Sequence, residues 1–485
     1  MNKIYAQGMR LVDELGRERI FNGVNAVDKS DYSAGKQTYP QLNEDAIKGF
    51  AERGFNLIRL GFTWAKLEPQ PGKYNDEYLD RVEEIIDLCE KYGIYVFLDM
   101  HQDLYSPQTN GDGAPKWAAL TDGFKSHPTR FVWAEDYFWG IACHRSFDNF
   151  WNNMHVNGKG LQDWYADCWK HVVDRFGGKA PVIGFDVLNE PFPGTPGGKC
   201  FRTLVGGAAK TILFDKQVNR IQLIKDAISN ERVEKVLGHI TYSVLHKSTG
   251  GCDKIIEEFD KKRYTPFIRK IGAAIREKNT DKILFLENSY YSNLGIPYST
   301  PAIEINGKRD PQQLFAPHAY DFMVDTPEYK YASNDRVGGI FGEHKKSQNR
   351  LQMPVIVGEW GGFGGSDDES WLNHIVYLLG LFDSNKWSNT YWCYMDSFFT
   401  SPLMKVFVRP YPAAVLGEIE SYGYDYDTKT FTMTFTQDSD GESTVCTPFP
   451  VKTLTVDGAE TEFTTNGTDT VFTTAKGSHK VEIKF

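Results

Sequence analysis

The chain has 485 residues, 41% of them hydrophobic and 24% charged, a composition typical of a soluble globular protein. Its formal net charge is −10 and it has no basic tract, which argues against nucleic acid as a partner and against an anionic membrane held by charge alone. No stretch approaches the ~20 apolar residues that span a bilayer. We therefore expect no transmembrane segment, and contact with a membrane surface stays open.

The first 19 residues alternate polar and apolar side chains and lack the continuous apolar core of a signal peptide. The seven cysteines are odd in number and form no CxxC pair, so free thiols in a reducing compartment are the simplest account. Pairing of Cys200 with Cys252 stays open, since both lie in glycine-rich sequence. We expect a cytoplasmic protein, although a secreted form that has lost its signal would have the same features.

Eight short apolar runs, separated mostly by helical patterns, follow one another along the chain. The runs are 20–24, 57–60, 94–100, 182–188, 283–286, 314–316, 355–357 and 390–393. In the helical pattern over 76–92, apolar side chains recur on one face. Continuous apolar runs are typical of strands buried on both faces in a parallel sheet. The sequence therefore predicts an α/β fold, a (β/α)8 TIM barrel over residues 1–412.

Two long insertions, and a change to short alternating runs from residue 413, complete the predicted organisation. Insertions at about 102–151 and 191–262 follow the third and fourth runs, at the end of a barrel where active sites are built. Residues 413–485 show short alternating runs rich in Thr, Val and Phe, with Asp457-Gly458 as a hairpin signal. They predict a small C-terminal antiparallel β-sandwich.

Polar or tryptophan side chains stand in or just after seven of the eight apolar runs. They are Arg59, His101, Asp103, Asn189, Glu190, Glu287, His318, Tyr320, Glu359 and Trp392. One such residue could be a structural cap, but seven converging runs are hard to explain by structure alone. Glu287 is interpreted as structural and left out of the predicted site.

Two of these carboxylates could flank a glycosidic bond. Glycoside cleavage needs one carboxylic acid to protonate the leaving oxygen and a second carboxylate to attack the anomeric carbon or activate water. Arg59 could keep Glu359 ionised, which suits a nucleophile. Glu190 has no arginine partner in the sequence and has His318 as a possible neighbour, so its pKa should be raised, which suits the acid/base.

In its ordered motifs the chain resembles glycoside hydrolase family 5 of clan A, and within it the endoglycoceramidase branch. The motifs are the stretches at 56–64, 98–103, 147–151, 189–194, 318–320 and 409–412, together with Glu359 and Trp392. The resemblance implies that Asn189 binds the sugar 2-hydroxyl and that Tyr320 and Arg59 orient Glu359. It also implies a sugar site lined by His101, Asp103, Trp151 and Trp392, with Lys29 holding a glucose hydroxyl.

The resulting hypothesis is a retaining β-glycoside hydrolase that cleaves a β-glucosyl linkage to a hydrophobic aglycone, such as a glycosphingolipid. We expect no metal and no other cofactor, because no HExxH motif is present and the double-displacement mechanism needs none. A β-glucosidase or glucanase without lipid preference, a steryl β-glucosidase and a non-catalytic carbohydrate-binding protein remain as alternatives. Trp133, Tyr137, Phe138 and Trp139 could form an apolar wall for a lipid chain or a buried core.

Overall fold

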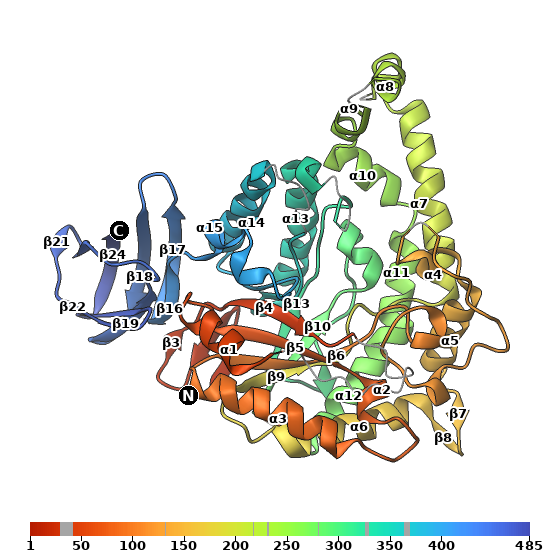
Figure 1. Cartoon of the computed structure of the whole chain (residues 1–485), viewed down its shortest axis with the longest axis horizontal. Helices are drawn as coiled ribbons and strands as arrows, with labels where there is room; N and C mark the ends of the chain where they lie inside the picture. Colours follow the sequence, from red (N-terminus) through yellow and green to blue (C-terminus); the bar gives the residue numbers. More distant parts are fainter. Residues whose placement is uncertain are drawn as a thin grey trace.

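The computed structural model describes residues 1–29, 42–130, 132–216, 218–229, 232–279, 281–324, 329–362 and 369–485. Eight parallel strands lie in the order β13-β10-β9-β6-β5-β4-β15-β14 (Figure 1). Parallel bridges from Phe315 to Val355 and from His318 to Glu359 join the two ends of this sheet. The predicted TIM barrel is confirmed.

The barrel strands lie within a few residues of the predicted apolar runs. They are β4 (Asn22–Val27), β5 (Leu57–Thr63), β6 (Tyr95–His101), β9 (Val182–Asp186), β10 (Ile283–Glu287), β13 (Gln313–Ala316), β14 (Ile356–Val357) and β15 (Ser388–Tyr391). Every residue of β5 and β6 is buried, as expected for strands covered on both faces. The first strand begins and ends later than its predicted run, and the eighth earlier.

Most helices outside the strands bury one face. The helices include α1 (Glu44–Ala51), α2 (Trp64–Leu67), α3 (Asp76–Lys91), α6 (Leu161–Phe176), α12 (Thr265–Arg276), α13 (Asn334–Leu351), α14 (Leu372–Asn385) and α15 (Met404–Phe407). All four residues of α2 are buried. Asn43, Asn75 and Ser333 cap α1, α3 and α13 by accepting a backbone N–H of the first turn. The apolar face predicted for residues 76–92 is the buried face of α3.

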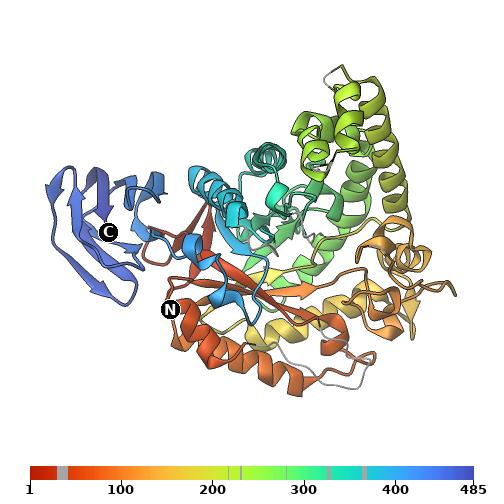
Figure 2. The same ribbon diagram turned by 45° about the horizontal axis from the view of Figure 1, so that its top comes forward.

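The two segments expected as insertions form helices. The first contains α4 (Glu135–Trp139) and α5 (Ile141–Trp151). The second contains α7 (Thr195–Phe214), α8 (Arg220–Ala227), α9 (Arg232–Gly238), α10 (Tyr242–Thr249) and α11 (Asp253–Phe259). Figures 1 and 2 show α7 to α10 standing out from the barrel as an arm at the upper right, with α8 at its tip in Figure 1.

Antiparallel sheets form the predicted C-terminal unit, beside the barrel (Figures 1 and 2). One sheet contains β17 (Glu418–Asp425), β18 (Thr430–Gln437), β24 (Gly477–Lys484), β20 (Thr453–Val456) and β21 (Ala459–Glu460). The other contains β16 (Tyr411–Leu416), β19 (Gly441–Cys446), β23 (Asp469–Thr474) and β22 (Phe463–Asn466). Asp457 and Gly458 turn between β20 and β21 with positive φ angles, which confirms the predicted hairpin.

The N-terminal strands join this second sheet, which the sequence did not predict. They are β1 (Ile4–Gln7), β2 (Arg10–Asp13) and β3 (Arg17–Glu18). Glu18 in β3 pairs with Val415 in β16, so the N-terminal strands and the first strand of the C-terminal unit share one sheet. The division at residues 412 and 413 therefore stays a prediction. None of the helices in the described part of the chain combines the length and apolarity of a membrane crossing.

Candidate active site at the carboxyl end of the barrel

A buried arginine organises the carboxyl end of the barrel. Arg59 in β5 is fully buried and donates to carboxylates at 2.6 to 2.9 Å. Its acceptors are Asp186 and Glu287, at the ends of β9 and β10, and Glu359, with Asp99 of β6 at 3.0 Å. Burial opposes the charge, but these carboxylates outweigh it and hold the pKa of Arg59 well above its usual range.

Glu359 follows β14 and is held at both carboxylate oxygens. Arg59 Nη1 donates to its Oε1 at 2.7 Å, and the Tyr320 hydroxyl donates to its Oε2 at 2.7 Å. Both donors fix the orientation of the carboxylate. The predicted contacts of Arg59 and Tyr320 with Glu359 are therefore present in the structure.

Glu190, which follows β9, has the opposite kind of environment. Its φ is +40°, the left-handed region that residues other than glycine seldom adopt, and its N–H donates to Glu287 Oε2 at 2.6 Å. Its Oε1 accepts from Asn293 Nδ2 at 2.6 Å and lies 3.1 Å from His318 Nδ1. Burial raises the pKa of Glu190, the His318 contact opposes this, and the Glu359 charge adds to the rise.

The two carboxylates lie close together. One oxygen of Glu190, one ring nitrogen of His318 and one oxygen of Glu359 all lie within 4.8 Å of one another. His318 Nδ1 is 3.6 Å from Glu359 Oε2, so the imidazole lies beside both groups. Carboxyl groups ~5–5.5 Å apart allow direct attack on the sugar, whereas a gap of ~6.5–9.5 Å leaves room for a water. The geometry favours direct attack.

Glu287 belongs to this site, although the sequence-based interpretation made it structural. It accepts from Arg59 and from the Glu190 N–H, and its Oε1 lies 3.3 Å from His318 Nε2. Burial opposes ionisation, but His318 and Arg59 lower the pKa of Glu287 to about 2. In return, Glu287 and Glu359 overcome burial and hold the pKa of His318 well above its usual range. Glu287 thus keeps His318 charged beside the acid.

Asp99 and Asp186 were also missed. Asp99 lies inside β6 and Asp186 is the last residue of β9. Both stand in runs that are otherwise apolar, and both side chains contact Arg59. A carboxylate within a continuous apolar run was the available signal, because an unpaired charge in a buried strand would be costly.

Four other predicted residues gather in a second cluster. Lys29 forms an ion pair with Asp103, and its ammonium lies 4.4 Å from the centre of the Trp392 ring. The Trp392 ring stacks on His101 with centroids 5.5 Å apart. Asp99 accepts from His101 Nδ1 at 2.8 Å, and despite burial it raises the pKa of His101 to about 10. An aromatic ring beside charged hydrogen-bonding groups suits a sugar with its apolar face and its hydroxyls.

Asn189 and Trp151 have different positions. The Asn189 amide accepts from Arg59 Nη2 and donates to the Gln102 carbonyl, both at 2.9 Å, so it lies in the network under the pair. Trp151 is buried among core aromatic rings, including Phe259 and Phe267, and its indole N–H donates to the Phe192 carbonyl. The structure does not bring Trp151 to the carboxylate pair, because its position at the end of α5 faces the core.

The aromatic segment of the first insertion is divided between core and surface. Tyr137 is fully buried and donates its hydroxyl toward Gln102 at 3.3 Å, and Phe138 stacks on Phe201 of α7. Trp133 and Trp139 are exposed. The buried-core alternative therefore holds for Tyr137, and the apolar wall for a lipid chain stays a prediction.

Among the described residues, three groups have side chains arranged as metal ligands could be. They are His101, Asp103 and Asp112; Glu190, His318 and Glu359; and Asp99, Asp186 and Glu287. Lys29 pairs with a member of the first group, and Arg59 pairs with members of the other two. Each group is thus already matched to a cationic side chain. Cys200 and Cys252 are thiols, and Cys252 donates to the Cys200 carbonyl at 3.3 Å.

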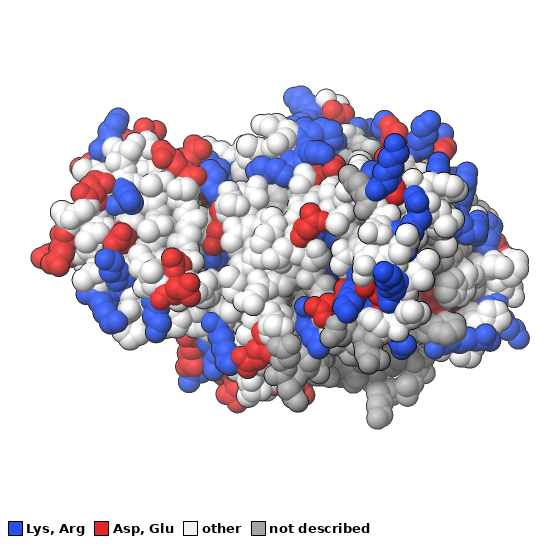
Figure 3. Space-filling model, turned by 90° about the horizontal axis from the view of Figure 1, so that it is seen from above, with Lys and Arg blue, Asp and Glu red and all other residues white. Residues whose placement is uncertain are grey.

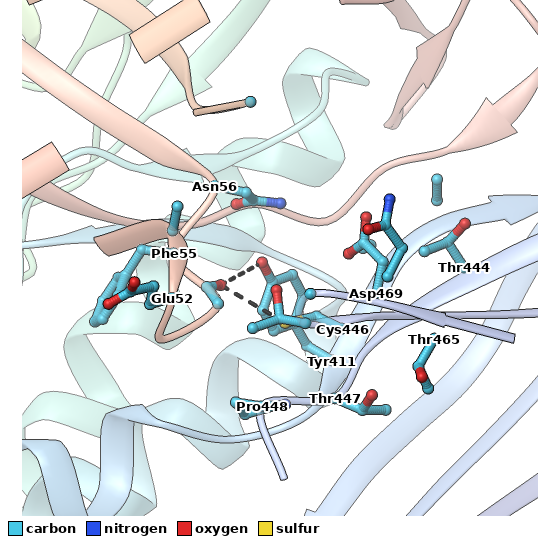
Figure 4. A pocket seen from close by; sticks show the side chains of 18 of the residues that line it. Glu52, Phe55, Asn56, Tyr411, Thr444, Cys446, Thr447, Pro448, Thr465 and Asp469 are labelled. Carbon is cyan, nitrogen blue, oxygen red and sulfur yellow. Dashed lines mark hydrogen bonds between the residues drawn. The ribbon is translucent and has the colours of Figure 1, made fainter. Parts of the chain in front are cut away.

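A cleft of about 910 Å³ lies at the opposite end of the barrel, against the C-terminal sheets. Its lining includes Phe55 and Asn56, which precede β5, and Tyr411 and Cys446 of the second sheet (Figure 4). The Tyr411 hydroxyl and the Cys446 thiol both donate to the Gly54 carbonyl, which joins the two units there (Figure 4). Barrel enzymes carry their catalytic groups at the carboxyl end of the strands, so this cleft is not the catalytic site.

Two family models match most of the chain. Residues 13–231 and 245–397 match cellulase (glycosyl hydrolase family 5), and residues 409–484 match the glycoside hydrolase family 5 C-terminal domain. An endoglycoceramidase of Hydra vulgaris is 34% identical over 38% of this chain and 39% of its own length. A glucosylceramidase of Aspergillus fumigatus is 46% identical over 30% of this chain and 24% of its own length.

These alignments thus span well under half of the relatives' own length. A solved structure of endo-glycoceramidase II from Rhodococcus sp. matches with a TM-score of 0.74 over 98% of both chains, at 22% identity. At that identity the likeness supports the fold alone.

Proposed function

This chain belongs to glycosyl hydrolase family 5, and from that premise we propose that it is a retaining β-glycosidase that cleaves a β-glucosyl linkage to a hydrophobic aglycone, a glycosphingolipid. The observation that carries the proposal is the pair Glu190 and Glu359, with oxygens within 4.8 Å and unlike surroundings. The names of relatives that align with part of the chain, endoglycoceramidase and glucosylceramidase, support the choice of substrate class.

In the first step Glu359 attacks the anomeric carbon while Glu190 protonates the departing oxygen. The C–O bond to the aglycone breaks, and an ester forms between the sugar and Glu359. Arg59 and Tyr320 hold the attacking carboxylate, and burial raises the pKa of Glu190, which favours the protonated form that an acid needs. The aglycone leaves with the proton that Glu190 supplies.

In the second step Glu190 acts as the base. Esterification removes the negative charge of Glu359, which is one of the causes that raise the pKa of Glu190. The pKa of Glu190 therefore falls in the intermediate, and the group can take a proton from water. Water attacks the anomeric carbon, the ester bond breaks, and Glu359 returns to its ionised form with retention of configuration.

The cluster of Lys29, His101, Asp103 and Trp392 supports a sugar site beside this pair. The Trp392 ring offers an apolar surface, and the charged groups offer donors and acceptors for hydroxyls. The alternatives are a glucosidase with no lipid preference and a steryl glucosidase, which would use the same pair and differ only in the aglycone.

Azide tests the roles of the two carboxylates. With a dinitrophenyl glucoside, we expect azide to restore turnover of Glu359→Ala and to yield the α-glucosyl azide, because azide replaces the missing nucleophile. With Glu190→Ala the same reagents should yield the β-azide, because the glucosyl-enzyme still forms. The exposed Glu460→Ala is the matched control and should retain wild-type rates. Full activity of either variant without azide would overturn the assignment.

The substrate is tested by mass spectrometry of the products from a panel of glucosylceramide, a longer glycosphingolipid, a steryl glucoside and a cello-oligosaccharide. We expect cleavage that releases ceramide to have a higher kcat/KM than cleavage of the steryl glucoside or the cello-oligosaccharide. Preferred cleavage of the oligosaccharide would refute the lipid preference and leave the roles of Glu190 and Glu359 intact.

A further inference from the structure

The arm formed by α7 to α10, residues 195–249, presents apolar side chains to solvent. On α7 the exposed positions recur every three to four residues and form one stripe. Its large apolar side chains are Val205, Leu213 and Phe214, and it also contains the basic residues Lys199, Arg202 and Lys210. The opposite face packs on α10, where Gly207 lies so close to the Ser248 carbonyl that a Cβ would be 2.3 Å away. The stripe is therefore the outer face of a helix whose inner face is already covered.

Helix α8, at the tip of the arm, turns its apolar face to solvent and buries a polar side chain. Ile221, Ile224 and Ile228 are spaced as one helical face and are 71%, 66% and 82% exposed. The buried side chain of α8 is Asp226, which accepts from Gln222 Nε2 at 2.8 Å and lies 2.8 Å from His239 Nε2. Folding alone does not account for this orientation, because burying isoleucine and exposing aspartate would be favoured. A contiguous exposed apolar face of this kind marks an interaction surface.

The charge of the arm differs in sign from that of the whole chain. Residues 195–249 contain nine Lys or Arg and four Asp or Glu, a net charge of +5 in a chain of net charge −10. Lys216, Arg220 and Lys225 are exposed around the three isoleucines. Figure 3 looks down on the top of Figure 1, and there blue side chains outnumber red ones over the right-hand part of the molecule.

We propose that the arm docks on an anionic lipid surface, with Phe214 and the α8 isoleucines inserted between headgroups. Helices with an apolar face flanked by Lys and Arg lie in the membrane interface, where the basic groups meet anionic headgroups. A second copy is disfavoured as the occupant, because a two-fold contact would bring together two arms that each have a net charge of +5. This binding goes beyond the proposed function and stands without it.

The position of the arm links docking to the barrel mouth. Helix α7 begins at Thr195, five residues after Glu190, so the loop that carries the acid continues directly into the arm. At the foot of the arm the exposed Trp139 packs on Phe201 with ring centroids 5.7 Å apart, which extends the apolar surface toward the first insertion. A protein held by the arm would keep its barrel mouth near the lipid surface.

Vesicle sedimentation of the full chain tests the proposal. We expect binding to phosphatidylcholine vesicles that contain phosphatidylserine, and much weaker binding to phosphatidylcholine alone. The triple variant Ile221→Ser, Ile224→Ser, Ile228→Ser should bind about ten-fold more weakly because the inserted face is lost. Lys216→Ala with Lys225→Ala should weaken binding in low salt and have little effect in high salt.

Matched controls are the exposed Leu15→Ser and the exposed pair Lys308→Ala and Lys476→Ala, which lie outside the arm and should bind like the wild type. All arm variants should hydrolyse a water-soluble nitrophenyl glucoside at the wild-type rate. The glucoside assay tests the proposed glycosidase activity separately from lipid binding. If no hydrolysis is found, the vesicle result is still valid. Equal binding of the wild type and the triple variant would overturn the proposal. A dimer in sedimentation velocity that the triple variant abolishes would assign the face to a second copy instead.

Discussion

The two ends of the barrel lumen contain opposite kinds of side chain. The amino end is filled by an apolar cluster, in which Phe97 stacks on Phe285 and Ile4 and Leu11 of the N-terminal hairpin take part. The carboxyl end contains Arg59, His318 and a ring of buried carboxylates. Strands β5, β6, β9 and β10 supply residues to both ends, so the difference comes from which lumen-facing positions are apolar.

The apolar end of the lumen serves stability, and the charged end serves the chemistry. The apolar end gains free energy from burial and asks only for close packing. The charged end must offset the desolvation of several ions, and it can do so only if every partner is in place. The functional end should therefore respond to pH and to single charge changes, and the apolar end should not.

The largest expected effect contrasts Arg59→Leu with Phe97→Ala. Removing Arg59 leaves buried carboxylates without their counter-ion and should cost about 3–5 kcal/mol of unfolding free energy at pH 7. Phe97→Ala should cost a similar ~3–5 kcal/mol through its cavity. Urea unfolding at pH 7 and pH 5 separates the two, since only the Arg59→Leu deficit should shrink as carboxylates take up protons. An equal pH response in both variants would remove the distinction between the ends.

Glu287→Gln tests the charged end more finely. The folded pKa of Glu287, about 2, lies below its ordinary value of 4.5, so its ionised form stabilises the fold above pH 4.5 and this contribution is lost as the pH falls toward 2. At about 1.4 kcal/mol per pKa unit, the variant should lose about 3 kcal/mol at neutral pH. Thermal unfolding from pH 7 to pH 3 should show the deficit narrowing below pH 4.5. The exposed Glu460→Gln should show no such trend.

Glu18→Gln, in the sheet shared by β3 and β16, should increase stability at pH 7, whereas Glu287→Gln should decrease it. Burial raises the pKa of Glu18 to about 6, above its ordinary 4.5, so stability is greatest below pH 4.5 and falls as the pH rises through 6. The amide can still accept the Ile419 N–H, so the variant should gain about 2 kcal/mol at pH 7 and nothing at pH 4. A loss of stability at pH 7 would show that the Glu18 charge has a partner that outweighs its burial.

The smallest effects compare two tryptophans. Trp392→Ala should raise KM for a soluble glucoside about ten-fold and leave stability nearly unchanged, because the ring is partly exposed beside His101. Trp151→Phe should cost about 1 kcal/mol, since the Phe192 carbonyl loses its donor, with kinetic constants close to wild type. Steady-state kinetics of both variants measures KM, and thermal unfolding measures their stability. A changed KM for Trp151→Phe would return that residue to the sugar site.

Most of the barrel could be predicted because buried parallel strands have continuous apolar sequences with polar ends. The same rule predicts that Glu190, Glu359, Arg59 and His318 meet at one mouth of the barrel. Glu287 was excluded because a single strand-end carboxylate also fits a structural role, and its partners come from other strands that only the closed barrel brings near it.

Other features depend on contacts far apart in sequence. Trp151 lies in one of the motifs that carry the family 5 resemblance. Whether its side chain faces the core or the barrel mouth depends on how the insertions pack. The N-terminal alternation of residues 1–19 is compatible with strands, and its partner, β16, is almost the whole chain away. Local patterns contain no signal for such a pairing.

The pairing of β3 with β16 also has a consequence for synthesis on the ribosome. The barrel strands emerge in order, each beside a neighbour already made, but the first hairpin must wait for residue 415 before Glu18 meets Val415. Until then β3 has a free edge that could pair with other chains. We expect a nascent chain arrested before residue 411 to be captured by chaperones and cut by protease within residues 1–19, and release past residue 416 to protect that segment.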